Sequence, residues 1–119
     1  MSDPGFAKTP QPPYYAAIFS SQRNGKGEAD YATAAERMFE LAMQQPGYLG
    51  AESVRDANGF GITVAYFDSE ENILRWRNHT EHAATRVRGK REWYEHFEVR
   101  VAKVERAYNG PALSSRSPE

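Results

Sequence analysis

The amino-acid sequence predicts one α+β domain whose elements follow the order β-α-β-β-α-β. Three patterns support this prediction: apolar side chains that alternate along four segments, helical apolar spacing in two others, and an Asn-Gly pair between two β-rich runs. The chain has 119 residues, which fits a single domain with a modest core. Its ends are rich in proline or serine, so we expect residues 1–13 and 109–119 to be disordered and the folded domain to span residues 14–108.

The first strand is expected in YYAAIFSSQR, residues 14–23, where apolar side chains fall on both faces. Such a strand is typical of the centre of a sheet that is covered on both sides. After a polar loop, YATAAERMFELAMQQ shows helical spacing, with Asp30 as a plausible N-cap and Pro46-Gly47 as the stop. The apolar stripe of this helix consists of Tyr31, Ala35, Met38, Phe39 and Ala42.

Two β-rich runs, YLGAESVRD and FGITVAYFD, are separated by Ala57-Asn58-Gly59. An Asn-Gly pair favours the tight turn that joins two antiparallel strands, so these runs predict a β-hairpin. In the second run, one face carries Ile62, Val64 and Tyr66, and the other carries Thr63, Ala65 and Phe67. The hairpin supplies the second and third strands.

Asp68 and Glu71 match a capping box, which predicts the start of a second helix, and Gly89 is expected to end it. The apolar face of this helix consists of Ile73, Trp76, Thr80, Ala83 and Val87. The last strand is expected in WYEHFEVRVAKVERAY. One of its faces carries Phe97, Val99 and Val101. The next apolar residue, Val104, breaks this alternation, which predicts a bulge near Ala102-Lys103.

This order of elements is the ferredoxin-like arrangement, a four-stranded antiparallel sheet with two helices on one face. The helix-free face of the sheet would still carry large apolar side chains. Because soluble monomers rarely expose an apolar face of that size, we expect a second copy of the chain to cover it, sheet against sheet. The apolar side chains on the two faces include Tyr14, Ala17, Ile18, Phe19, Tyr66 and Phe67.

The composition excludes several classes of protein. The 15 basic and 16 acidic residues give a net charge of −1, which argues against nucleic acid as a partner and against an electrostatic membrane anchor. The chain has no cysteine, so disulfides, thiolate catalysis and cysteine-ligated metal sites are excluded. No apolar run reaches the roughly 20 residues of a membrane span, and the N-terminus lacks the pattern of a signal peptide. We therefore expect a cytoplasmic protein.

The stretch FDSEENILRWRNHTEH, followed by GKREWYEHFEVRVAKVER, resembles the antibiotic biosynthesis monooxygenase domain family of the dimeric α+β barrel superfamily. The resemblance covers residues 14–108 and rests on an aromatic residue before Asp-Ser-Glu-Glu, a tryptophan and two histidines three residues apart. It implies a homodimer. Members of the family include quinone-forming monooxygenases without cofactor, haem-degrading monooxygenases and many proteins of unknown activity. The haem-degrading branch resembles this chain least, because its iron-ligating histidine would fall at Arg86 and its first-strand asparagine has no counterpart here.

Three candidate site residues lie in the stretch WRNHTEH. Trp76 falls on the apolar face of the second helix, where it either anchors the helix on the sheet or forms the wall of a ligand pocket. His79 lies at the edge of that face, and His82 points outward if the helix is straight. The two histidines lack a third metal ligand, so we expect no metal. Either they act in acid–base catalysis, or they accompany a kink at His79 with Asn78 or Thr80 as a helix cap.

The remaining candidates lie outside this stretch. Trp93 and Tyr66 are expected to help bind a substrate, although Trp93 and the adjacent Tyr94 also fit a core or an interface. His96 is expected to be structural or solvated. The basic run RVRGKR is followed by three glutamates, which is typical of a salt-bridged surface. No nucleotide, flavin or haem signature is present, so we expect no cofactor.

The resemblance implies a monooxygenase without cofactor that oxidises a small aromatic substrate, a quinol or an anthrone, with O2. In such a mechanism a base removes a proton and the resulting anion reduces O2 inside an apolar pocket. We assign His79 and His82 to catalysis, and Trp76, Trp93 and Tyr66 to substrate binding. The alternatives are a non-catalytic or stress-related dimer that binds a small ligand and, third, a haem-binding or haem-degrading protein.

Overall fold

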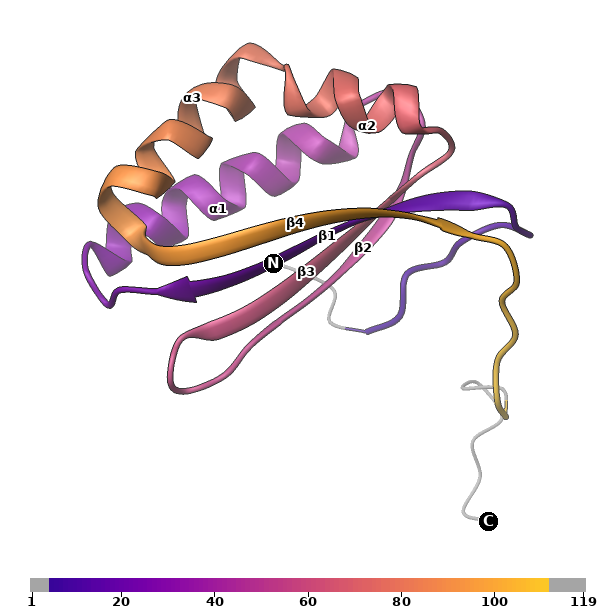
Figure 1. The fold of residues 1–119 in the computed structure, drawn as a ribbon, viewed down its shortest axis with the longest axis horizontal. Helices are drawn as coiled ribbons and strands as arrows, with labels where there is room; N and C mark the ends of the chain where they lie inside the picture. Colours follow the sequence, from indigo (N-terminus) through magenta and orange to yellow (C-terminus); the bar gives the residue numbers. More distant parts are fainter. Residues whose placement is uncertain (1–4, 112–119) are drawn as a thin grey trace.

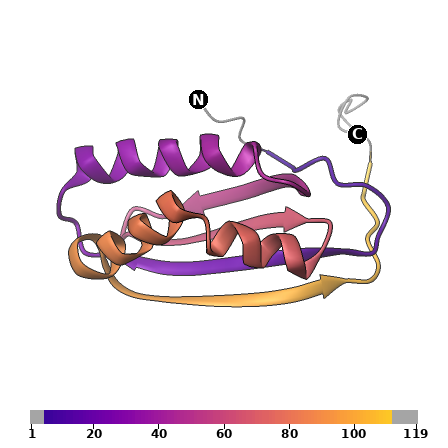
Figure 2. The ribbon, with the colours of Figure 1, turned by 90° about the horizontal axis from the view of Figure 1, so that it is seen from above.

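The computed structural model describes residues 5–111, which form a four-stranded antiparallel sheet with the described helices on one face (Figure 1, Figure 2). The predicted ferredoxin-like α+β class is therefore confirmed. Along the chain the elements are β1 (Tyr14–Arg23), α1 (Glu28–Met43), β2 (Tyr48–Arg55), β3 (Phe60–Phe67), α2 (Glu70–Arg77), α3 (Thr80–Arg88), η1 (Gly89–Trp93) and β4 (Tyr94–Val104). None of these helices combines the length and the apolar character needed to cross a membrane.

The strand order in the sheet is β2-β3-β1-β4, so β1 is a central strand, as predicted. Ala17 of β1 lies between Ala65 of β3 and Val101 of β4, on the face that packs against the helices. The even-numbered side chains of β1 point to the opposite, helix-free face. The core lies between the helices and the sheet around Phe67, which is fully buried. Its other buried members are Leu41, Ala42, Ile73 and Trp76.

The first helix, α1, begins at Glu28 rather than after the predicted cap at Asp30. Gly27 takes the N-cap position with a φ of 61°, and its carbonyl oxygen accepts a hydrogen bond from the backbone N–H of Tyr31 at 2.8 Å. Asp30 lies instead in the first turn, where a carboxylate interacts favourably with the positive end of the helix dipole. Apolar spacing could not reveal this start, because it depends on the left-handed backbone of a glycine.

The predicted β-hairpin is confirmed, with β2 and β3 joined by a short loop. The carboxylate of Asp56 accepts hydrogen bonds from the backbone N–H groups of Asn58 and Phe60, at 2.9 and 3.0 Å. Gly59 has a φ of 93°, in the left-handed region that favours glycine. The Asn-Gly pair therefore acts in the turn as its sequence indicates.

The predicted second helix is in fact two helices, α2 and α3, followed by a π-helical turn, η1. Ser69 rather than Asp68 caps α2, since its Oγ accepts a hydrogen bond from the backbone N–H of Asn72 at 3.1 Å. Asp68 accepts from the side-chain amide of Asn72 at 2.8 Å. As predicted, Gly89 caps the end of the α-helix, since α3 ends at Arg88, and the chain then continues into the π-helical turn η1. A Cβ atom at Gly89 would lie 3.0 Å from the ring of Tyr94, so a larger residue here would require that ring to shift.

The bulge predicted at Ala102-Lys103 is wrong, because β4 pairs regularly with β1 there. The register shift lies at the opposite end of the strand pair, next to Gln22. Val104 pairs with Tyr14 on the helix-free face. The slip in apolar phase therefore reflects a sheet with apolar side chains on both faces, and not an extra residue.

Residues 5–13 form a strap that contacts the helix-free face of the sheet. The backbone N–H of Ala7 donates to the carboxylate of Glu52 at 2.9 Å, and the hydroxyl of Thr9 donates to the hydroxyl of Tyr14 at 3.0 Å. Tyr14 is 5% exposed. The strap thus covers the end of this face where β1 begins.

These contacts differ from the sequence prediction, in which residues 1–13 are disordered. The start of that segment, and all but residues 109–111 of the predicted C-terminal tail, lie outside the described residues. The domain bounds 14–108 stay a prediction.

Candidate functional site

Two residues, Asn78 and His79, interrupt the helix between α2 and α3. The backbone of His79 has a φ of −59° and a ψ of 131°, and its imidazole Nδ1 accepts a hydrogen bond from the backbone N–H of Glu81 at 3.2 Å. The predicted kink is therefore present, but His79 itself is the N-cap of α3, rather than Asn78 or Thr80. Glu81 also pairs with Arg37 of α1 at 2.8 Å, which holds the start of α3 against α1.

This break brings Trp76, His79 and His82 together. The imidazole of His82 stacks on the indole of Trp76, with ring centroids 4.0 Å apart and 7° between the planes. The ring of His79 packs on the same indole at 5.6 Å. The prediction that His82 points outward is wrong, because it assumed a straight helix. Three of the predicted site residues therefore form one cluster, which we call the Trp76 site.

Hydrogen-bond partners determine which nitrogen carries the proton in each neutral imidazole. His82 Nδ1 lies 2.8 Å from the carbonyl oxygen of Trp76, which can only accept, so Nδ1 donates and Nε2 keeps its lone pair. His79 has the opposite arrangement, since its Nδ1 accepts from a backbone N–H and its Nε2 therefore carries the proton. Beside the indole of Trp76, the two imidazoles therefore offer one hydrogen-bond acceptor, Nε2 of His82, and one donor, the Nε2–H of His79.

Burial lowers the pKa of His82 below the ordinary value for histidine. The hydrogen bond to the carbonyl of Trp76 favours the protonated form, but it does not outweigh burial together with the positive charges of Arg86 and Arg77. His82 is therefore neutral at pH 7 and can accept a proton.

Arg86 of α3 is a cation at this site that the sequence did not single out. It belongs to the run RVRGKR, which was expected to be a salt-bridged surface, and Arg88 and Arg91 do pair with Glu92, at 3.3 and 3.8 Å. Arg86 differs, because its Nη2 donates to the carbonyl oxygen of Arg77 at 3.1 Å and its buried Nε has no partner among the described residues. Arg86 lies one helical turn after His82, and this spacing is the feature of the sequence that places the two side chains next to each other.

The two other predicted binding residues, Trp93 and Tyr66, lie apart from this cluster. Tyr66 lies on the helix-free face, where its hydroxyl donates to Glu52 at 2.8 Å. Burial and the hydrogen bond to that carboxylate raise the pKa of Tyr66 to about 12. Trp93 is buried at the end of η1, in edge-to-face contact with Tyr31 at 5.6 Å. Neither residue belongs to the core cluster that contains Trp76.

Trp93 belongs to a second aromatic and basic cluster, which we call the hairpin-end cluster. Its centre is Arg23, which is 4% exposed and whose guanidinium lies 4.0 Å above the ring centroid of Tyr31. Arg23 donates to the carbonyl oxygens of Trp93 and Lys26, at 2.6 and 3.1 Å, and pairs with Glu28 at 3.0 Å. Its Nε alone has no hydrogen-bond partner among the described residues. The guanidinium therefore joins the end of β1 to the loop before α1 and to η1.

Arg55 is the second guanidinium of the hairpin-end cluster. It donates to the hydroxyls of Ser21 and Tyr31, at 2.9 and 3.1 Å. A side chain at Gly61 would come within 2.8 Å of its guanidinium carbon, so the glycine leaves room for Arg55 to lie on the sheet. The hydroxyl of Tyr94 donates to that of Tyr31 at 3.1 Å, and burial raises the pKa of Tyr94.

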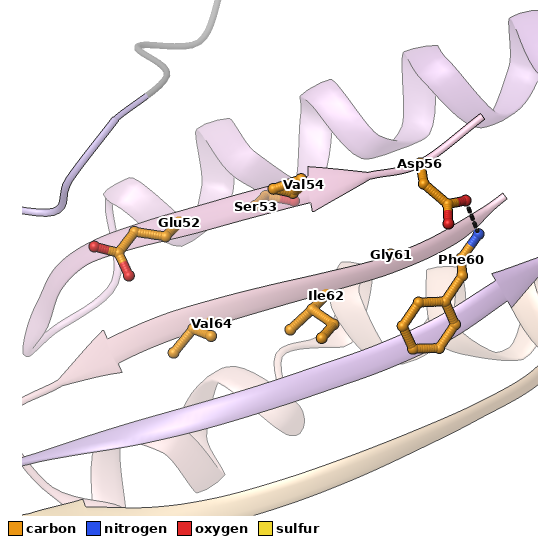
Figure 3. A pocket seen from close by; sticks show the side chains of 8 residues that line it. All are labelled: Glu52, Ser53, Val54, Asp56, Phe60, Gly61, Ile62 and Val64. Carbon is orange, nitrogen blue, oxygen red and sulfur yellow. Dashed lines mark hydrogen bonds between the residues drawn. The ribbon is translucent and has the colours of Figure 1, made fainter. Parts of the chain in front are cut away.

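Two open hollows, of about 410 and 210 Å³, lie on the helix-free face. Figure 3 shows the larger one between β2 and β3, with Glu52 toward one end and the Asp56–Phe60 hydrogen bond at the other. The smaller hollow includes His96, which is exposed and lies 3.0 Å from Glu98. Neither hollow is lined by residues of the Trp76 site.

The Trp76 site offers acid–base chemistry rather than a metal centre. Residues 5–111 contain no group of three or more side chains that could hold a metal ion. Arg86 occupies the position where the haem-degrading branch would have histidine, and a guanidinium is not an iron ligand. The arrangement can accept a proton at Nε2 of His82 and can stabilise an anion with Arg86 and the N–H of His79.

A family model for antibiotic biosynthesis monooxygenases matches residues 13–88, which span β1 through α3 and contain the Trp76 site. The chain belongs to this family. The uncharacterized protein YqjZ of Bacillus subtilis (strain 168) is 56% identical over 100 residues, which cover 84% of this chain and 87% of the relative. The name of this relative states no activity. Membership of the antibiotic biosynthesis monooxygenase family does not by itself identify a substrate.

Solved structures show the same fold. Protein SO0527 of Shewanella oneidensis has a TM-score of 0.69 at 17% identity, over 86% of this chain and 100% of that chain. A variant of SnoaB, a cofactor-independent oxygenase from Streptomyces nogalater, has a TM-score of 0.68 at 10% identity, over 79% of this chain and 95% of that chain. Identities this low show a common fold, which agrees with the architecture predicted from the sequence.

Proposed function

We propose that this chain is a monooxygenase that needs no cofactor and oxidises a small aromatic substrate, a quinol or an anthrone, with O2. We further propose that it acts in the cytoplasm as a homodimer with a second copy on the helix-free face. Membership of the antibiotic biosynthesis monooxygenase family supports the reaction class, and the description of SnoaB supports chemistry without a cofactor. The observation that carries the proposal is the neutral His82, whose Nε2 keeps its lone pair beside Trp76.

The chemistry of such a substrate needs no external reductant. Oxidation of an anthrone converts CH2 and O2 into C=O and H2O, so the substrate supplies all the electrons. The step that needs help is removal of a proton, which makes the substrate electron-rich enough to reduce O2. Nε2 of His82 would take that proton, and Arg86 with the Nε2–H of His79 would stabilise the resulting anion.

Oxygen uptake with a panel of anthrones and hydroquinones tests this proposal. We expect turnover in the wild-type chain and a rate that falls roughly 10²- to 10⁴-fold in His82→Gln, because the base is removed. His96→Gln is the matched control, since His96 lies on β4, on the opposite face of the sheet from the Trp76 site. Absence of oxygen uptake with every member of the panel would contradict the proposal.

A non-catalytic dimer that binds a small ligand is the second candidate. It is favoured by the position of the two hollows, which lie on the helix-free face and away from Trp76. In that case an aromatic ligand binds without oxygen uptake, and His82→Gln leaves its affinity unchanged. Calorimetric titration in oxygen-free and in air-saturated buffer separates the two candidates, because only a monooxygenase adds the heat of turnover in air.

A further inference from the structure

The helix α3, whose start carries His82, has no buried residue that could fix its place on the protein. None of its nine residues is buried, whereas α1 and α2 each bury two apolar side chains. It also begins directly after the break at Asn78 and His79, so α2 does not hold it as one continuous helix would. The position of α3 beside α1 (Figure 1, Figure 2) therefore depends on polar contacts more than on a core.

Two ion pairs join α3 to α1. At the start of α3, Arg37 donates through Nε to one carboxylate oxygen of Glu81 at 2.8 Å and through Nη2 to the other at 3.1 Å. At the end of α3, Arg88 lies 3.7 Å from Asp30. The partners are seven residues apart on each helix, which is about two helical turns, and the helices therefore run antiparallel here. Only the first pair has the two-pronged geometry that sets a direction as well as a distance.

Glu81 connects this ion pair to both histidines of the Trp76 site. Its backbone N–H donates to Nδ1 of His79 at 3.2 Å, while its carboxylate is held by Arg37. The next residue is His82, whose ring stacks on Trp76 with centroids 4.0 Å apart and 7° between the planes. A shift of the start of α3 would therefore move His82 from the indole and remove the donor to His79.

We propose that Arg37 is a positioning residue of the Trp76 site, because its two-pronged contact with Glu81 holds the start of α3 where His82 stacks on Trp76. Arg37 acts through Glu81, and no contact with the reacting atoms is assigned to it. The consequence for turnover rests on the proposed function, whereas the consequence for the geometry of the two imidazoles does not.

The ion pair keeps its charges at the pH of turnover. The hydrogen bond from Arg37 lowers the pKa of the Glu81 carboxyl below its usual value, and the same bond raises the pKa of Arg37. A carboxyl with a lowered pKa stays ionised until the pH falls below its ordinary range, so the pair is intact at neutral pH. A loss of turnover near pH 6.5 therefore reports on His82 and not on this contact.

The same ion pair contributes little to the stability of the fold. The side chains of Arg37 and Glu81 are 49% and 44% exposed, and exposed ion pairs add little to the free energy of unfolding. We therefore expect substitutions of Arg37 to change the Trp76 site without a measurable change in the midpoint of urea unfolding. This separates a positioning residue from a structural one such as Arg23, which is buried.

Oxygen uptake with the panel described above tests the consequence for turnover. In Arg37→Gln we expect kcat to fall roughly 10- to 10²-fold, because the base is displaced, and KM to stay close to that of the wild type. Asp30→Asn is the matched control, since it removes the ion pair at the far end of α3, and we expect its kcat to be unchanged. Wild-type kcat in Arg37→Gln would overturn the proposal.

Arg37→Lys tests the two-pronged contact separately from the charge. Lysine keeps the positive charge but cannot bind both carboxylate oxygens with a planar fork, so we expect kcat to lie between those of the wild type and Arg37→Gln. Wild-type kcat in Arg37→Lys would overturn the orienting role of the fork.

Proton NMR of the His82 ring tests the geometry without any substrate. Because the ring current of a stacked indole moves imidazole proton signals upfield, we expect upfield signals for His82 in the wild type and in Asp30→Asn. In Arg37→Gln we expect them to move toward those of His96, whose side chain is 72% exposed. Unchanged His82 signals in Arg37→Gln would overturn the proposal. If these signals move although no member of the panel is oxidised, the proposed function fails and the positioning role of Arg37 stands.

Charge reversal provides an independent test. Arg37→Glu alone places two carboxylates together, and adding Glu81→Arg restores an ion pair between the same two positions while keeping the backbone N–H that His79 uses. We expect the double variant to lie closer to the wild type than Arg37→Glu alone, both in kcat and in the His82 signals. A double variant that recovers neither would overturn the proposal.

Discussion

The Trp76 site and the hairpin-end cluster both combine aromatic rings with basic side chains, but they use their polar atoms differently. In the hairpin-end cluster, Arg23 donates to two backbone carbonyls and pairs with a carboxylate, and Arg55 donates to two hydroxyls. A buried arginine Nε without a partner among the described residues occurs in both places, at Arg23 and at Arg86. The difference lies at the Trp76 site, where Nε2 of His82 keeps its lone pair.

This difference separates a structural clamp from a reactive site. Polar atoms that are bonded to the protein hold elements together, whereas polar atoms that remain available can act on a ligand. Residue composition alone does not distinguish the two clusters. Four substitutions test the distinction, and we take them from the largest expected effect to the smallest.

The largest effect is expected on stability, at the hairpin end. Arg23→Met removes a buried hydrogen bond to the carbonyl of Trp93, a part-buried one to the carbonyl of Lys26 and the ion pair with Glu28, so we expect the free energy of unfolding in urea to fall by about 3 kcal/mol. Arg91→Met is the control, because Arg91 is exposed and its contact with Glu92 is 3.8 Å long, and we expect a change within about 0.5 kcal/mol. If the two variants unfold alike, the hairpin-end cluster is not a clamp.

The second effect concerns the pH dependence of turnover. Protonated His82 cannot accept a proton, and its pKa is lowered, so we expect kcat/KM for oxygen uptake to stay level as the pH falls to about 6.5 and to decrease only below that. Arg86→Met removes one of the cations that lower this pKa. The decrease in kcat/KM then moves to higher pH, whereas Arg88→Met leaves its position unchanged. An identical profile for Arg86→Met would place Arg86 outside the site.

A smaller effect is expected for the hydroxyl of Tyr94. Tyr94→Phe removes one hydrogen bond to Tyr31, and we expect a loss of about 1 kcal/mol in the free energy of unfolding. Tyr108→Phe makes the same chemical change at a residue that is 94% exposed, and we expect no measurable change in the free energy of unfolding. Equal stability of the two variants would show that the hydroxyl pair adds nothing to the clamp.

The smallest effect on stability is expected at His79, where capping and chemistry can be separated. His79→Asp keeps an acceptor for the N–H of Glu81, so we expect the free energy of unfolding to change by less than about 0.5 kcal/mol. It removes the N–H donor that we assign to anion stabilisation, so we expect slower oxygen uptake. A His79→Asp variant with wild-type turnover would restrict His79 to its capping role.

The order of the elements could be predicted because apolar periodicity and the Asn-Gly turn are local signals. The starts of α1 and α2 could not, because they depend on the backbone of Gly27 and on the choice between the adjacent Asp68 and Ser69. The two-residue break at Asn78 and His79 is likewise invisible to a helical pattern that continues on both sides of it.

The candidate site was predicted in part for the same reasons. Trp76 and two histidines were singled out by residue type, but the stacking of His82 on Trp76 follows from the break and not from ideal helical phase. Alternation places Tyr66 and Phe67 on opposite faces, yet it does not say which face the helices cover. Arg86 was not recognised because its neighbours Arg88 and Arg91 form the surface salt bridges that the charge pattern indicates.

The protonation state of His82 is the point on which the proposed chemistry depends, and nitrogen-15 NMR of the imidazole rings measures it directly. The chain has three histidines, so single His→Gln variants assign every signal. We expect His82 at pH 7 to be neutral, with the proton on Nδ1 and an unprotonated Nε2 whose signal shifts when a phenolic ligand binds, and His79 to carry its proton on Nε2. A His82 ring that is protonated at pH 7, or neutral with the proton on Nε2, would contradict the assignment of His82 as the base.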